Sequence, residues 1–254
     1  MIHLKSSEEL NKMRQAGYIV AKVLELMREQ AVPGVTTAEL DAMAETLIRD
    51  HHAIPSFKGY PPGSPNPFPA TICASINAEL VHGIPSDRVL KEGDILSVDV
   101  GAIHEGYHGD AAVTLPIGEI DASTQRLLDV TKGSLYAGIA AAKAKNRTGD
   151  ISAAIQEYVE RHGLNVVREY TGHGIGRQMH EDPQVPNFGE RGRGVRLRAG
   201  MTVALEPMVL SGSPRVRVLD DNWTVIAADG KLTAHFEHTI LVQDGEAEIL
   251  TRLS

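Results

Sequence analysis

Apolar residues recur at helical spacing in the first part of the chain, and capping sequences mark two helix starts there. Ser6 to Glu9 forms a capping box, and the apolar periodicity after it continues until Pro33-Gly34. A second box, Thr36 to Glu39, begins another amphipathic run. We therefore predict two helices, followed over 51–73 by an irregular proline-rich loop.

The rest of the chain alternates between strand-like and helix-like patterns. Strand-like segments are short apolar runs, whereas helix-like segments are longer and repeat with the helical period. Strands are predicted at 95–100, 111–115, 166–167, 202–205, 232–236 and 239–242, and helices at about 123–144 and 150–162. The order is helices, strands, helices, strands, which favours an α+β fold.

This order of elements reflects a repeat in the sequence. Residues 90–99 align without gaps on 197–206, and His82-Gly-Ile matches His173-Gly-Ile. The first turns of the second and fourth predicted helices also match. Several matches in the same order predict an internal duplication of about 110 residues. We expect a single domain over 1–254, with halves of about 1–120 and 121–254 that share one sheet.

Acidic residues occupy matched positions in the two halves. A single acid beside a strand is usually a solvated strand end, but Asp99 lies within an apolar run that has the character of a buried strand. An ionised carboxylate buried without a partner is costly, and several that converge require a cation. The pattern favours a site for two divalent ions with carboxylate and imidazole ligands. The candidate ligands are Asp99, Asp110, Glu206 and Glu237, with either His82 or His173.

Composition narrows the class of protein. The 254 residues are 42% hydrophobic and 23% charged, which is enough to bury a sizeable core. The net charge of −8 argues against nucleic acid or an anionic membrane as a general partner. A single cysteine, Cys73, excludes an intramolecular disulfide, and no signal sequence or membrane-length apolar run is evident. We therefore expect a cytoplasmic protein.

Several longer motifs resemble type I methionine aminopeptidases, in register from about residue 5 to 253. The motifs are Cys73-Ala-Ser-Ile-Asn77, His82-Gly-Ile-Pro85, Gly109-Asp110, Thr171-Gly-His173-Gly-Ile-Gly176, Gly200-Met-Thr, Glu206-Pro-Met and Phe236-Glu237-His-Thr. The resemblance implies a pita-bread fold, in which two αββ halves related by a pseudo-two-fold axis enclose a dinuclear metal site. It also implies that Asp99 holds one metal, that Asp110 and Glu237 bridge both, and that His173 and Glu206 complete the second.

The resemblance further implies the roles of residues around the metals. A water or hydroxide that bridges the metals would attack the first peptide carbonyl, with Glu206 as general base. His82 and His180 would contact substrate, and His180 would help to stabilise the oxyanion. The methionine side chain would meet a pocket of aromatic and soft groups, which suits a thioether. The pocket residues would be Phe57, Tyr60, Cys73, His82, Met179 and Trp223.

Two features depart from the usual pattern of the family. The stretch between Tyr60 and Phe68 is longer and rich in proline, and Met179 stands where many members carry phenylalanine. The expected substrates are nascent proteins and peptides whose second residue is small, and the ribosome surface is a candidate partner of an enzyme we expect to be a monomer. The metals could be cobalt, manganese, iron or zinc.

Two other functions remain as alternatives. A proline-specific aminopeptidase or prolidase would share the fold and the five ligands, although such proteins usually carry an extra N-terminal domain. A non-catalytic pita-bread protein used for binding would be expected to have lost ligands.

Overall fold

The structure, a computed structural model, describes residues 2–253 and begins with two helices, α1 (Ser7–Gln30) and α2 (Thr37–Asp50). Both start where the capping boxes predict. Ser6 Oγ accepts a hydrogen bond from Glu9 N–H at 3.3 Å, and the Glu9 carboxylate accepts one from Ser6 N–H at 2.8 Å. The same reciprocal pair joins Thr36 and Glu39. The two predicted helices are confirmed.

A β-hairpin forms the centre of the first half. Strands β4 (Ile95–His104) and β5 (Tyr107–Pro116) pair antiparallel along their whole length. Strand β4 also pairs with β2 (Ile72–Ile76) and with the short β1 (Ile54–Pro55). The predicted strands cover only the apolar part of the hairpin away from its turn, because the glycines and histidines near the turn break the apolar pattern while the backbone ladder continues. The predicted loop over 51–73 overlaps the first two residues of β2.

The second half contains helices α3 (Ala122–Ala141) and α4 (Thr148–Glu160), near their predicted bounds. Its largest sheet has the order β15-β14-β9-β7-β8. Strands β9 and β14 agree with prediction, but β7 and β8 were not predicted, because glycines and prolines give them no apolar alternation. The bounds are β7 (Thr171–Gly174), β8 (Glu181–Pro186), β9 (Thr202–Leu205), β14 (His238–Leu241) and β15 (Glu248–Ile249).

Two small three-stranded sheets complete the fold. One has the order β13-β10-β6, and the other, β11-β12-β3, joins a strand of the first half to two of the second. The bounds are β3 (Glu79–Val81), β6 (Asn165–Val166), β10 (Met208–Leu210), β11 (Val216–Val218), β12 (Val225–Ala227) and β13 (Thr233–His235). The predicted strands at 166–167 and 232–236 correspond to β6 and β13.

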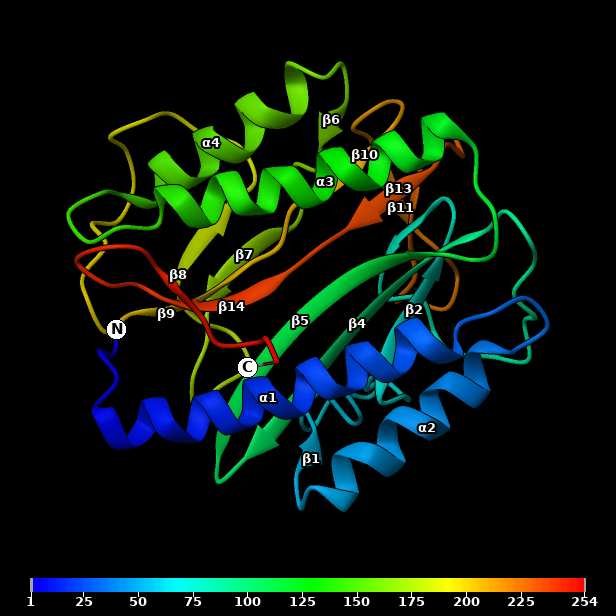
Figure 1. Ribbon diagram of the computed structural model, residues 1–254, viewed down its shortest axis with the longest axis horizontal. Coiled ribbons are helices and arrows are strands. Elements are labelled where there is room, and N and C mark those ends of the chain that lie inside the picture. The colour runs from blue at the N-terminus through cyan, green and yellow to red at the C-terminus, as the bar shows by residue number, and fades with distance from the viewer. Residues whose placement is uncertain (1, 254) are drawn as a thin grey trace.

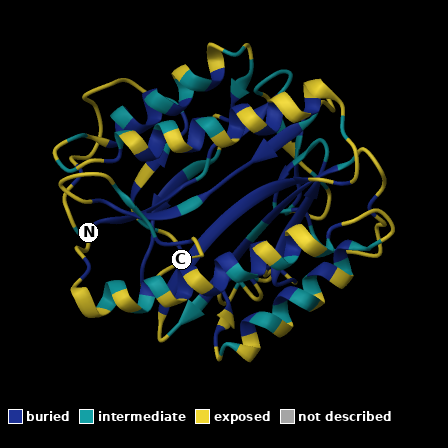
Figure 2. Ribbon diagram, in the orientation of Figure 1, coloured by how far each residue is buried: buried dark blue, intermediate teal, exposed yellow. Residues whose placement is uncertain are grey.

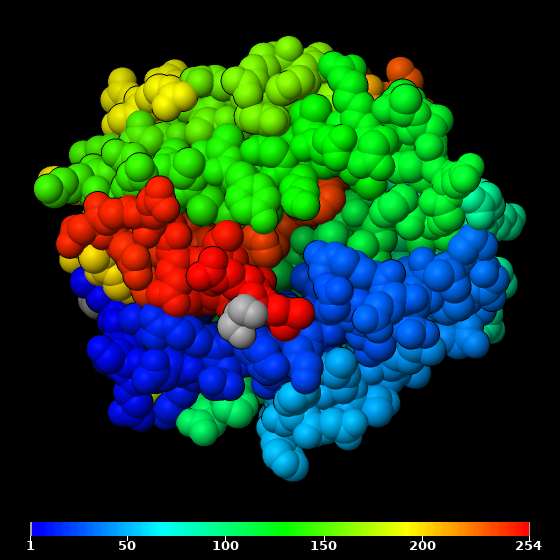
Figure 3. Space-filling view, viewed as in Figure 1, coloured from blue at the N-terminus to red at the C-terminus, as the bar shows by residue number. Residues whose placement is uncertain are grey.

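The helices and sheets form two layers. In Figure 1, α1 and α2 lie along one side of the molecule and α3 and α4 along the other, with the strands between and behind them. The long central strands β4 and β5 are mostly buried, whereas the helices turn exposed residues outward (Figure 2). Figure 3 shows this helical face, where the C-terminal segment, in red, lies between the two helix pairs on the left of the view. The main hydrophobic core runs through both halves.

The two large sheets meet where β5 passes the segment that leads into β14. Glu237 N–H donates to the Ala112 carbonyl at 2.9 Å, and Thr239 Oγ1 donates to the Asp110 carbonyl at 2.8 Å. These bonds bring the acidic residues of the two halves to one place at the centre of the molecule. Among the described residues, no helix is both long and apolar enough to cross a membrane.

Candidate metal centre

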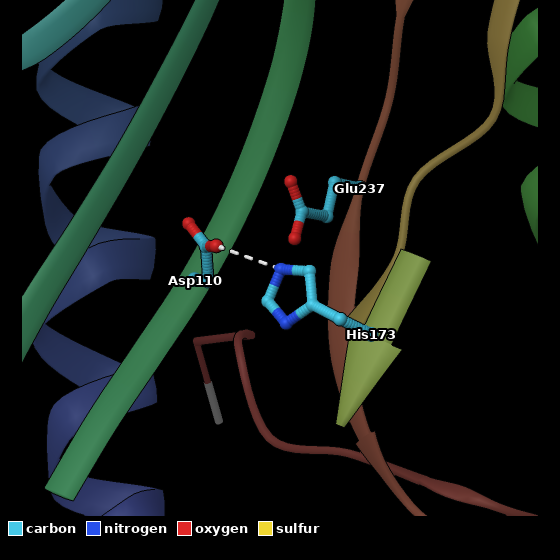
Figure 4. Close-up of side chains that lie close together, drawn as sticks. All are labelled: Asp110, His173 and Glu237. Carbon is cyan, nitrogen blue, oxygen red and sulfur yellow. Dashed lines mark ion pairs between the residues drawn. The ribbon is translucent and has the colours of Figure 1, made fainter. Parts of the chain in front are cut away.

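The matched acids of the two halves converge at the junction of the sheets. Asp110 lies on β5, Glu237 lies between β13 and β14, and both are almost fully buried. His173 on β7 faces them, and one ligand atom from each of these three residues lies within 4.8 Å of the others. Figure 4 shows the three side chains pointing toward a common space. His173 Nε2 is 3.9 Å from Asp110 Oδ2 and 3.6 Å from Glu206 Oε1.

The carboxylates at this junction lack ordinary partners. Within residues 2–253, three buried carboxylate oxygens have no hydrogen-bond donor: Asp99 Oδ1, Asp110 Oδ1 and Glu237 Oε1. A buried oxygen with no donor costs free energy, and no lysine or arginine forms an ion pair with these acids among the described contacts. Divalent cations take such oxygens as ligands, together with imidazole nitrogen. The donor set therefore fits a metal centre.

The electrostatics agree with this interpretation. The pKa values of Asp110, Glu206 and Glu237 are raised well above their usual range. Burial is the largest cause, and repulsion from neighbouring carboxylates is the second. Burial raises the pKa of Asp99 to about 7, against the opposing effect of a hydrogen bond with Asp110. A bound cation would favour the ionised form of all four groups.

His173 has the tautomer that a metal ligand needs. Its Nδ1 lies 2.8 Å from the Gly174 carbonyl oxygen, which can only accept a hydrogen bond. The ring proton is therefore on Nδ1, and Nε2 keeps its lone pair on the side of the acids. Burial is the main cause that lowers the pKa of His173 to about 4, so the ring is neutral near pH 7.

A cavity of about 210 Å³ opens above the acids. Its walls are largely aromatic or soft, and the structure brings all of the sequence-predicted site residues to its lining. They are Phe57, Tyr60, Cys73, His82, Asp99, Asp110, His173, Met179, His180, Glu206, Trp223 and Glu237. Phe68, Tyr170 and Thr171 also line it and were not predicted.

Sequence reasoning also missed a histidine behind the cavity. His235 is 1% exposed, and within the described residues neither of its ring nitrogens has a hydrogen-bond partner. Its Nε2 lies 3.7 Å from Glu237 Oε2, and with Glu206 and Glu237 it forms a second group whose ligand atoms lie within 4.8 Å of one another. Burial is the first cause that lowers its pKa to about 3. The only sequence feature that could have indicated His235 is its position two residues before the candidate ligand Glu237.

Comparison with known structures identifies the class of this fold. A crystal structure of methionine aminopeptidase from Thermotoga maritima matches with a TM-score of 0.96 and 47% identity, covering 100% of both chains. A prolidase from Pyrococcus furiosus matches with a TM-score of 0.80 and 21% identity, covering 99% of this chain but 66% of its own, which shows a shared fold alone. The fold is the pita-bread fold, with two related halves around the candidate metal site.

Comparison of sequences then identifies the family. The model of metallopeptidase family M24 matches residues 11–244. Methionine aminopeptidase 1 of Bacillus subtilis (strain 168) is 52% identical over 253 residues, covering 100% of both chains. The chain belongs to metallopeptidase family M24 and, within it, to the methionine aminopeptidases. Members of this family of metallopeptidases use metal ions, in agreement with the cluster of acids and histidine.

Proposed function

We propose that this chain is a methionyl aminopeptidase, which removes the N-terminal methionine from peptides and nascent proteins whose second residue is small. The observation that carries the proposal is the cavity of about 210 Å³, with an acidic floor and walls of aromatic, thioether and thiol groups. Soft, polarisable walls suit a methionine side chain. An acidic floor suits the free α-amino group that distinguishes a chain terminus from an internal peptide bond.

Five residues would hold two divalent metal ions, which could be cobalt, manganese, iron or zinc. Asp99 would hold one ion, Asp110 and Glu237 both, and His173 and Glu206 the second. The ions would supply a water of lowered pKa and polarise the scissile carbonyl. The support is that buried oxygens of Asp99, Asp110 and Glu237 have no other partner among the described residues.

The remaining roles fall to side chains that line the same cavity. Glu206 accepts the proton that the attacking water loses, since its carboxylate lies beside the acids and His173 at the cavity floor. His180 donates a hydrogen bond to the carbonyl oxygen as negative charge develops there. His82 contacts the substrate, with its ring edge-on to Trp223 at 6.1 Å. Phe57, Tyr60, Cys73, Met179 and Trp223 surround the methionine side chain.

We further propose that residues 1–254 act as one catalytic domain with halves of about 1–120 and 121–254. Both halves contribute acids to the cluster, so neither half would bind metal as proposed without the other. The enzyme acts as a monomer in the cytoplasm, where nascent chains emerge, and the ribosome surface is a candidate partner. The net charge of −8 favours peptides over nucleic acid as its direct substrates.

Peptide hydrolysis tests the proposal directly. The purified chain is stripped with a chelator, and each metal is added back before assays on Met-Ala-Ser, Met-Leu-Ser and Ala-Pro-Ala peptides. We expect metal-dependent release of methionine from Met-Ala-Ser, and much slower cleavage of Met-Leu-Ser because a large second side chain meets the crowded floor. Comparable kcat/KM on the two methionine peptides would refute the size limit. Faster cleavage of Ala-Pro-Ala would indicate a proline-specific enzyme instead.

A further inference from the structure

Two neighbouring histidines in the cavity have different hydrogen-bond partners. The rings of His173 and His180 lie with their centroids 4.3 Å apart. His173 Nδ1 faces the Gly174 carbonyl oxygen, whereas His180 Nδ1 lies 2.6 Å from the Tyr60 hydroxyl oxygen. A carbonyl only accepts hydrogen bonds, but a phenol also donates them. The two rings can therefore be held in opposite tautomers.

The direction of the bond between Tyr60 and His180 follows from the chemistry of the two groups. Phenol is a stronger donor than acceptor, because the oxygen lone pair is delocalised into the ring, and a neutral imidazole nitrogen is a good acceptor. Burial raises the pKa of Tyr60, so its hydroxyl keeps its proton. The hydroxyl then donates to His180 Nδ1, and the ring proton of His180 must be on Nε2.

We propose that Tyr60 is a positioning residue, which holds His180 in the Nε2–H tautomer. With no lone pair on Nε2, His180 cannot act as a metal ligand beside His173, although the two rings are in contact. Its N–H is instead available to a carbonyl oxygen. This inference rests on the proposed function for the identity of that carbonyl, but the tautomer itself does not depend on the substrate.

The backbone around Tyr60 is held in a way that supports this role. Tyr60 N–H donates to the Phe57 carbonyl at 2.9 Å, and the Tyr60 carbonyl accepts from Phe68 N–H at 2.7 Å. Gly59 N–H donates to the Phe68 carbonyl at 2.8 Å, and the Phe68 ring lies edge-on to Trp223 at 5.2 Å. The proline-rich stretch over 61–67 therefore begins and ends at backbone segments that are hydrogen-bonded to each other. Its length need not disturb Tyr60 or the pocket wall.

Nitrogen NMR of the full chain, labelled with ¹⁵N-histidine, tests the tautomers without any activity assay. Spectra of the metal-free and zinc-loaded protein report which ring nitrogen carries the proton, and a His180→Gln variant assigns the signals. We expect the proton of His180 on Nε2 and that of His173 on Nδ1. In Tyr60→Phe, which keeps the ring and loses only the hydroxyl, His180 should become a mixture of tautomers. Tyr170→Phe is the matched control, because Tyr170 lines the cavity but contacts His82.

Kinetics then test whether the tautomer matters for turnover. Tyr60→Phe should lower kcat on Met-Ala-Ser by about threefold to tenfold, the usual effect of one hydrogen bond, with KM nearly unchanged. In a His180→Ala background, the same change should have no further effect on kcat, because Tyr60 acts through His180.

Either of two results would overturn the inference: a proton on His180 Nδ1 in the wild type, or a His180 tautomer that Tyr60→Phe leaves unchanged. An equal loss of kcat from Tyr60→Phe in the His180→Ala background would also overturn it. If the wild type released no methionine from any peptide, the proposed function would fail, while the NMR spectra would still decide the role of Tyr60.

Discussion

The histidine segments of the two halves match in sequence but differ in structure. His173 lies in the extended strand β7, paired with Ala204 of β9, and its ring is fixed against the acids. His82 directly follows β3 and has a left-handed backbone with φ of 61°. Its ring lies edge-on to Tyr170 at 5.7 Å and to Trp223 at 6.1 Å, in the wall of the cavity. Of these two histidines, only His173 belongs to a cluster of potential ligands within residues 2–253.

The difference shows which features of a duplicated motif stay equivalent. The glycine after each histidine packs against a backbone carbonyl, that of Ala74 for Gly83 and that of Asp182 for Gly174. The close packing is thus the same in both halves. The backbone conformation of the histidine is not, and it decides whether an imidazole faces the acids or the pocket wall.

The largest effect should come from His173→Ala. Loss of the imidazole that faces the acids should weaken metal binding by more than about 100-fold. That figure is the upper limit for the loss of a residue that only hydrogen-bonds to a metal ligand, and the loss of a ligand itself should exceed it. We expect kcat/KM on Met-Ala-Ser to fall by at least about 10³-fold. Equilibrium dialysis with metal analysis measures the first quantity. Full metal content in the variant would show that His173 is not a ligand.

His82→Ala sharpens the comparison, because it removes the matched histidine. It should lower kcat by about 10²-fold, as expected for a substrate-contacting group, while metal content stays nearly unchanged. The same dialysis and peptide assays apply to both variants. If His82→Ala lost metal as His173→Ala does, the two histidines would be equivalent and the contrast drawn from the backbone would be wrong.

The matched glycines should respond alike. A Cβ at Gly83 would collide with the Ala74 carbonyl, and one at Gly174 with the Asp182 carbonyl. Because backbone atoms cannot move aside as a flexible side chain can, each change to alanine should lower the free energy of unfolding by about 1–3 kcal/mol. Urea titration followed by circular dichroism measures this loss. Gly245→Ala, where a Cβ meets nothing within 4 Å, is the control and should leave stability nearly unchanged.

The smallest effect concerns acid stability at the start of α1. The Ser6 backbone N–H, and then the Tyr107 hydroxyl, lower the pKa of Glu9 from 4.5 to about 2. A lowered pKa stabilises the folded chain above pH 4.5, and this contribution disappears as the pH falls toward about 2. Glu9→Gln should therefore cost about 1 kcal/mol at neutral pH, as for a lost helix cap, and progressively less over that range. If the difference in the free energy of unfolding between wild type and variant stayed constant from pH 7 to 2, the stabilising role of the ionised Glu9 would be contradicted.

Local signals predicted the helices and several apolar strands, although the buried apolar strands β2 and β10 were not predicted. The capping boxes at Ser6 and Thr36 act within a few residues, so the helix starts follow from sequence. The apolar run at 202–205 matches β9. Strand β7 has no such signal, since its residues are Thr, Gly, His and Gly, and its extended conformation comes from pairing with β8 and β9. Pairing between segments distant in sequence leaves no local pattern.

The candidate site was visible in sequence because the duplication placed acids at matched positions. That signal identified Asp99, Asp110, Glu206 and Glu237, and the structure brings their side chains to one cavity. His235 lay outside the matched set, although its ring lies beside Glu237. Its proximity depends on how β13 passes β5, where His235 N–H donates to Thr114 Oγ1 at 2.8 Å.

By itself, the sequence determined the helix starts, the duplication and the residue types of the centre, because these depend on neighbouring positions or on direct matches along the chain. The residue pattern left His82 and His173 open, and the family resemblance implied His173. Only the tertiary structure shows why it is His173 that faces the acids, through a left-handed backbone at His82 and a strand at His173. It also decided the partner of each ring nitrogen. Tyr60 and His180 are 120 positions apart, and a hydrogen bond over such a separation exists only once the chain has folded.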